Sequence, residues 1–153
     1  MANRNVRILI ADDQCAQRSS LEKILNRLGY YRVAPVQSFS ELMTLTHYSC
    51  EPLELFDVLL INMELVRAAG VDVARFCRRN PQVRNALVYG VAAREMEVLL
   101  LIIEKSSSTR LVAVADEQSI RRFIEHIDPV GDSALAALVP SITPNLKAKN
   151  RGD

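Results

Sequence analysis

The sequence of 153 residues has no tryptophan and only four phenylalanines and four tyrosines. Aromatic side chains on which nucleotide bases could stack are therefore scarce. It also lacks an excess of charge of either sign, because 19 lysines and arginines nearly balance 18 aspartates and glutamates. A net charge of +1 gives no electrostatic reason to expect nucleic acid or an anionic membrane as the partner.

Cysteines are few, and they are not arranged in any known ligand or disulfide pattern. Cys15, Cys50 and Cys77 lie far apart, with no Cys-x-x-Cys pair and no Cys/His cluster. We therefore expect reduced thiols and neither a disulfide framework nor a zinc site. The longest aliphatic run, residues 98–103, is too short to span a bilayer. With no signal-peptide pattern at residues 1–5, these features predict a cytoplasmic protein.

Short apolar runs rich in β-branched residues alternate along the chain with segments of helical periodicity. Strands are predicted at 6–11, 31–36, 55–61, 86–91 and 111–115, and helices at 14–28, after a cap at Ser40, after Gly70, at 94–105 and at 117–127. This alternation predicts an α/β fold with a doubly wound, five-stranded parallel sheet, flavodoxin-like, in the order 2-1-3-4-5. We expect one domain over residues 1–129 and a linker or disordered tail over 130–153.

Polar residues follow the first and the third predicted strands. Asp12 and Asp13 end the first, and Asn62 ends the third. Because the carboxyl ends of parallel strands share one edge of the sheet, we expect an acidic pocket that brings these three residues together. Two interpretations stay open: the acids cap the first helix, or Asp12, Asp13 and Asn62 hold Mg²⁺ weakly through oxygen ligands.

These features, in this order, resemble the receiver domain of bacterial two-component response regulators. The resemblance rests on the acid pair, on residues 21–30 (Leu-Glu-Lys-Ile-Leu-Asn-Arg-Leu-Gly-Tyr), on the spacing from Asp57 to Asn62 and on Gly70, and it covers residues 6–127. It implies a role in phosphorelay signal transduction. In that family the acid pair holds Mg²⁺, and an aspartate at the position of Asn62 accepts the phosphoryl group.

The sequence departs from the family at the positions that carry its chemistry. Asn62 stands in the acceptor position, and an amide does not form the acyl phosphate that a carboxylate forms. Val91 stands where the family has a switching hydroxyl, and Ala113 where it has a lysine. The resemblance therefore implies a pseudo-receiver that is no enzyme and has no cofactor beyond weakly held Mg²⁺. Its expected partner is a signalling protein: a histidine kinase, a phosphotransfer protein or an output domain.

The six consecutive aliphatic residues at 98–103 cover every side of the fourth predicted helix. Some must be exposed unless a partner or another segment covers them. We assign an interface to Leu99, Leu100, Ile102 and Ile103, either with another partner or in a homodimer through the face that helix four, strand five and helix five form in receivers. Alternatively, part of the run is a buried strand, or residues 134–139 fold back over it.

Two other functions stay open. One is a ligand- or metal-sensing switch that uses the pocket of Asp12, Asp13 and Asn62. The other is an enzyme on the same scaffold, which the sequence disfavours because it has no glycine-rich phosphate loop and no Ser/His/Asp order.

Overall fold

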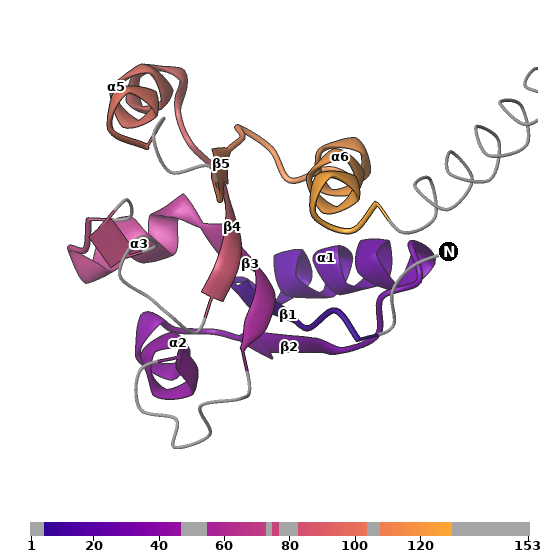
Figure 1. Cartoon of the computed structure of the whole chain (residues 1–153). Coiled ribbons are helices and arrows are strands. Elements are labelled where there is room, and N and C mark those ends of the chain that lie inside the picture. The colour runs from indigo at the N-terminus through magenta and orange to yellow at the C-terminus, as the bar shows by residue number, and fades with distance from the viewer. Residues whose placement is uncertain (1–4, 47–54, 73–74, 77–82, 104–107, 130–153) are drawn as a thin grey trace, which may run out of the picture.

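The protein is an α/β sandwich built on one parallel sheet. The computed structural model describes residues 5–46, 55–72, 75–76, 83–103 and 108–129. Its strands are β1 (Ile8–Ala11), β2 (Val33–Val36), β3 (Phe56–Asn62), β4 (Val83–Tyr89) and β5 (Thr109–Leu111). They lie in the order β2-β1-β3-β4-β5 (Figure 1). The prediction of a doubly wound, flavodoxin-like sheet with this strand order is confirmed.

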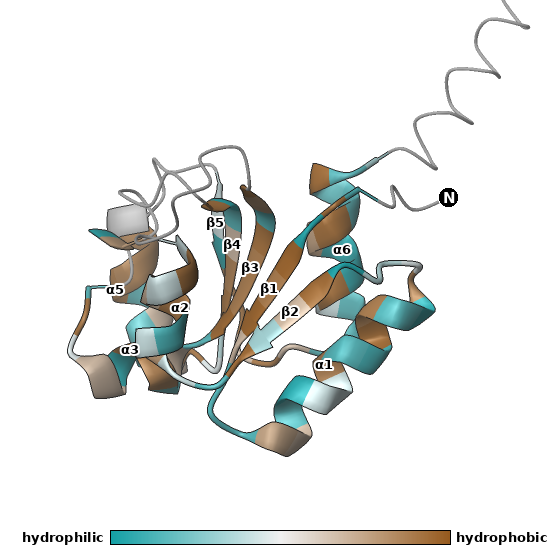
Figure 2. Cartoon of the chain, turned by 90° about the horizontal axis from the view of Figure 1, so that it is seen from below, coloured by the Kyte–Doolittle hydropathy of each residue, from teal (hydrophilic) through white to brown (hydrophobic). Residues whose placement is uncertain are grey.

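Helices cover both faces of the sheet. Those described are α1 (Cys15–Arg27), α2 (Phe39–Thr46), α3 (Met63–Ala69), α5 (Ala93–Ile103) and α6 (Glu117–Ile127). Helices α1 and α6 pack on one face, and α2, α3 and α5 on the other (Figure 1). Because both faces are covered, the central strands are almost wholly apolar, as the brown strands of Figure 2 show.

Two glycines end helices by adopting the left-handed backbone conformation. Gly29 (φ +99°) follows α1, and the N–H groups of Gly29 and Tyr30 donate to the carbonyls of Asn26 and Leu25 at 3.0 and 2.9 Å. The predicted stop at Gly29 is confirmed. Gly70 (φ +69°) ends α3, although the sequence pattern placed it before a helix.

Several predicted boundaries are wrong. Ser40 lies inside α2, and Ser38 is the residue that accepts from the Glu41 amide, at 3.1 Å. Strand β4 ends at Tyr89 instead of 91, because its ladder with β3 stops where Asn62 pairs with Tyr89. Strand β5 comprises only 109–111, since it pairs with just three residues of β4.

Helix α3 was not predicted, because it starts directly after β3 with no loop between them. Most of the helix predicted after Gly70 lies outside the described residues, apart from helical residues 75–76. Cys50, Cys77 and the predicted tail at 130–153 lie outside them too, whereas Cys15 is a free, exposed thiol. Within the described ranges, no helix is long and apolar enough to cross a membrane.

Candidate functional site

The residue that follows β1, Asp12, is the centre of a buried hydrogen-bond network. Its side chain is fully buried. Oδ1 accepts from the Gln14 amide at 2.9 Å, and Oδ2 accepts from Asn62 Nδ2 at 3.1 Å and from the Tyr89 hydroxyl at 2.6 Å. Three neutral donors thus replace the water that the carboxylate loses on burial.

Asn62 connects this network to helix α3. Its Oδ1 accepts from the Glu64 amide at 2.8 Å, which makes Asn62 the N-cap of α3, while its Nδ2 donates to Asp12. The backbone donor at Glu64 and the carboxylate acceptor at Asp12 together define the orientation of the amide. An aspartate at position 62 has an acceptor for the first bond and no donor for the second.

The structure separates the acid pair, so that only one member enters the network. Asp12 is buried, and Asp13 is exposed. Neither caps α1 in the expected way. The N-cap of α1 is Gln14, without a side-chain cap bond, and Asp12 contacts the amide of Gln14 itself. The interpretation that the acid pair supplies the N-cap of α1 is wrong, because the cap is Gln14 and Asp12 lies two residues ahead of it.

The same hydrogen bonds decide whether Asp12 and Asn62 could hold Mg²⁺. A cation there would need the oxygens of Asp12 and the carbonyl oxygen of Asn62. Both Asp12 oxygens and Asn62 Oδ1 already accept hydrogen bonds from within the protein, and the Asn62 amide turns its nitrogen toward Asp12. In this arrangement the residues do not fit a magnesium site.

Tyr89 is the functional residue that the sequence analysis missed. It is buried at the end of β4, directly beside Asn62 in the ladder. Burial, reinforced by the hydrogen bond to Asp12, raises the pKa of its phenol far above the ordinary value. The hydroxyl therefore stays protonated and donates. A tyrosine inside an apolar strand could have signalled this, because a buried hydroxyl needs a polar partner.

Gly90, and not Val91, is the residue of the β4 end that faces the amide. A Cβ atom on Gly90 would lie 3.1 Å from Asn62 Oδ1, and its φ of +77° is left-handed. Val91 is buried in the core. Ala113 lies at the same edge, where its carbonyl accepts from the Gly90 amide at 3.1 Å. Neither Gly90 nor Ala113 offers a hydroxyl or an ammonium group.

Gly90→Ala is expected to destabilise the protein more than Gly70→Ala does. Both residues have positive φ, which costs a Cβ-bearing residue about 1 kcal/mol or more. Of the two, Gly90 adds a close contact, whereas no atom of the described residues lies within 4 Å of a Cβ on Gly70. We expect the free energy of unfolding to fall by about 2 kcal/mol in Gly90→Ala and by about 1 kcal/mol in Gly70→Ala. Urea denaturation of both variants measures it, and equal losses would contradict the close approach of Gly90 to Asn62.

The aliphatic run of α5 is helical, so its interpretation as a buried strand is wrong. Val98, Leu100 and Leu101 are 58%, 48% and 77% exposed. Leu99, expected at the interface, instead packs half-buried against the core. The side chains of Ile102 and Ile103 lie outside the described residues. Leu100 is thus the expected interface residue that is exposed. Val98 and Leu101, which were not among the expected interface residues, are exposed as well.

The chain has a flavodoxin-like α/β fold with the strand order 2-1-3-4-5. No family model matches the sequence. No curated protein matches it either. A solved structure of a yeast Spc42 trimeric coiled coil (amino acids 181–211) fused to another structure is similar, with a TM-score of 0.57 and 18% identity over 99% of this chain and 98% of that one. At this identity the likeness extends to the fold alone.

Proposed function

We propose that the chain is a receiver-like signalling module that takes no phosphoryl group at position 62 and acts by protein–protein contact. The strand order and the placement of Asp12 and Asn62 at the carboxyl edge of neighbouring strands support this reading. Its partners are a histidine kinase, a phosphotransfer protein or an output domain, or a second copy of the chain.

The observation that carries the proposal is the Asn62 amide, bonded at both ends. Phosphoryl transfer to a receiver needs a carboxylate oxygen as nucleophile and a cation beside it. Here the Asn62 amide donates to Asp12 and accepts from the Glu64 amide. It therefore stands where the nucleophilic carboxylate and the cation would have to lie. Gly90 and Ala113 add no group that would bind phosphate. The edge of the sheet is held by internal hydrogen bonds that need no phosphate or cation.

Helix α5 is the surface that we propose for contact. Val98, Leu100 and Leu101 expose aliphatic side chains on one element. Apolar groups gathered on a surface helix favour association, because covering them removes apolar area from water. A protein partner that docks here therefore gains the burial of these three side chains.

The phosphate-independence of the module is tested by intact mass. After incubation with Mg²⁺ and acetyl phosphate, we expect an unchanged mass and an unchanged oligomeric state in sedimentation equilibrium. The physical reason is the absence of a nucleophilic carboxylate at position 62. A stable phosphoryl adduct mapped to Asp12, Asp13 or Glu64 would overturn the proposal.

The same sedimentation experiment tests the docking surface with a matched pair of variants. Leu101→Glu introduces a charge into the exposed face of α5, and we expect it to weaken self-association at least tenfold. Leu45→Glu is the control, because Leu45 is a partly exposed leucine of α2, on another helix. Identical association of the unsubstituted chain and both variants would contradict a homodimer through α5.

The ligand- or metal-sensing alternative is weaker on this structure. It needs free oxygen ligands on Asp12 and Asn62, and their hydrogen bonds already use those atoms. Among the described residues there is also no group of three or more His, Cys, Asp and Glu side chains that could hold a metal ion.

A further inference from the structure

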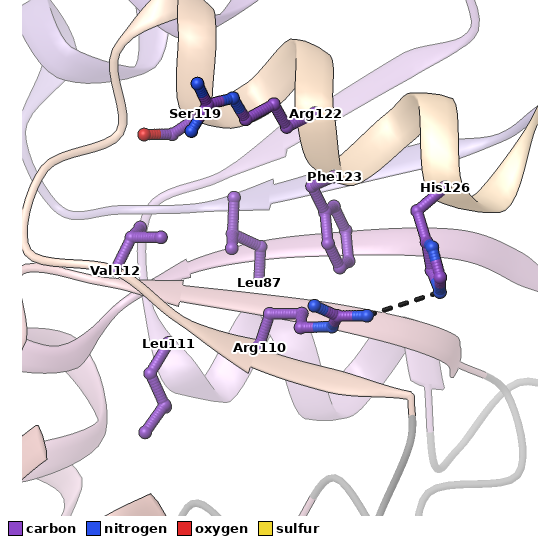
Figure 3. A pocket seen from close by; sticks show the side chains of 8 residues that line it. All are labelled: Leu87, Arg110, Leu111, Val112, Ser119, Arg122, Phe123 and His126. Atoms are coloured by element: carbon purple, nitrogen blue, oxygen red, sulfur yellow. Dashed lines mark hydrogen bonds between the residues drawn. The ribbon is translucent and has the colours of Figure 1, made fainter. Parts of the chain in front are cut away.

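A hollow outside the Asp12 network lies between strand β5 and helix α6 (Figure 3). Its volume is about 280 Å³. Leu87 and Phe123 are buried and Val112 is half-buried, and these three side chains form an apolar floor. The volume lies just below the usual range of ligand pockets, about 300–1,000 Å³, and suits a molecule with a single ring.

The rim of this hollow is positively charged. Arg110 comes from β5, and Ser119, Arg122 and His126 come from α6. Arg110 Nη2 lies 3.2 Å from His126 Nε2. Because a guanidinium group only donates, His126 Nε2 is the acceptor of this hydrogen bond. Figure 3 shows this pair at one end of the hollow and Ser119 with Arg122 at the other.

The two arginines of the rim have no carboxylate partner among the described residues. The contrast is the next residue of α6, Arg121, which is ion-paired with Glu117 at 3.1 Å. Hydrogen bonds to Ser119, more than the charge of Arg122, lower the pKa of the Asp116 carboxyl, and Arg122 and Asp116 do not form an ion pair among the described contacts. Among the described residues, no aspartate or glutamate lines the hollow itself.

We propose that this hollow binds a small organic anion, a carboxylate or a phosphate monoester carried on an apolar ring. The planar guanidinium groups of Arg110 and Arg122 present paired donors that match either anion. The floor of Leu87, Val112 and Phe123 removes the ring from water. This site is separate from the Asp12 network and does not depend on the proposed signalling role.

The test is a titration of the isotope-labelled full chain followed by backbone amide chemical shifts. The probes are phenyl phosphate, benzoate and inorganic phosphate. We expect saturable shifts confined to β5 and α6, with a Kd of about 1 mM for the ring-bearing probe that binds best and at least tenfold weaker binding of inorganic phosphate. The better of phenyl phosphate and benzoate identifies the acid group that the site prefers.

Matched variants distinguish binding at this site from a general electrostatic attraction of the anion to the protein surface. Of Arg110→Gln and Arg122→Gln, the variant at the end of the hollow that holds the acid group is expected to weaken binding at least tenfold. Arg121→Gln removes the same charge beside the hollow and is expected to leave the Kd within twofold. All three residues are exposed, so the fold is retained. Equal weakening by Arg121→Gln, equal binding of inorganic phosphate, or no saturable shift with any probe would overturn the proposal.

Discussion

Replacing Asn62 with aspartate is expected to lower the free energy of unfolding by about 3 kcal/mol at neutral pH without divalent cations. The substitution puts a second carboxylate where Asn62 Nδ2 lies 3.1 Å from the fully buried carboxylate of Asp12. One stabilising hydrogen bond is lost, and a like-charge contact replaces it. Position 62 is only half-buried, which keeps the cost at the lower end for an uncompensated buried charge.

The dependence on pH and Mg²⁺ identifies the cause of this loss. Repulsion raises the folded-state pKa of the new carboxyl above its unfolded value of about 4. Stability from the protonated form is fully present below pH about 4 and is lost as the pH rises through the folded pKa. Two facing carboxylates also form the oxygen set that Mg²⁺ accepts. We therefore expect millimolar Mg²⁺ at neutral pH to recover much of the loss.

Asn85→Asp supplies the control for this experiment. Asn85 is a half-buried asparagine of β4 whose Nδ2 donates to the Asp57 carbonyl at 3.0 Å, so its replacement also introduces a charge in place of a donor. No carboxylate of the described residues is hydrogen-bonded to the side chain of Asn85, so we expect destabilisation without recovery by Mg²⁺. Urea denaturation of both variants with and without Mg²⁺ decides the matter. An Asn62→Asp variant as stable as the unsubstituted chain would refute the network.

The helix at residues 117–127 was predictable because local and global signals agree there. Asp116 accepts from the Ser119 amide at 2.8 Å as an N-cap, and Ile120, Phe123 and Ile124 form a buried stripe with helical spacing. Periodicity and capping are local properties of the chain, so they can be read directly from it. The apolar strand runs are local in the same way.

The meeting of Asp12 and Asn62 at one edge of the sheet was predictable from the strand order. The contacts of Tyr89 and Gly90 were not, because they depend on the register between strands. Asn62 meets Tyr89 through the β3–β4 ladder, and the residue that faces the amide is then Gly90, one position before the expected Val91. A shift of one residue in a strand reverses the face of every side chain. Asn62 also has a second role, as the N-cap of α3, that the family resemblance hides.

Two buried tyrosines make the protein sensitive to high pH. Tyr89 donates to Asp12, and Tyr30 donates to Asp128 Oδ2 at 2.6 Å, where Asp128 ends α6. Burial, followed by the hydrogen bond to the adjacent aspartate, raises the pKa of both phenols well above the ordinary value of about 10. Both therefore keep their protons in the folded state at pH values at which the unfolded chain loses them.

The sign of the effect follows from proton linkage. A phenol whose folded pKa is raised contributes stability that is complete below pH about 10 and is lost as the pH rises toward the folded pKa. Between pH about 10 and the folded pKa, each tyrosine contributes a slope of up to about −1.4 kcal/mol per pH unit, and the two together about −2.7. We expect unfolding to set in steeply above pH about 11, with the absorbance of two phenolates appearing only as the fold is lost.

Single substitutions divide this slope between the two sites. Tyr30→Phe and Tyr89→Phe should each halve it relative to the unsubstituted chain, and each should lower stability at neutral pH by about 1–3 kcal/mol, because a buried carboxylate loses a donor. Tyr31→Phe is the control: Tyr31 is 70% exposed, so we expect its replacement to leave the slope unchanged. If all phenols ionised near pH 10 with the fold intact, neither hydrogen bond would hold its tyrosine protonated. The pH dependence of stability thus measures two contacts separately: Tyr89 reports on the Asp12 network, and Tyr30 reports on its hydrogen bond to Asp128 at the end of α6.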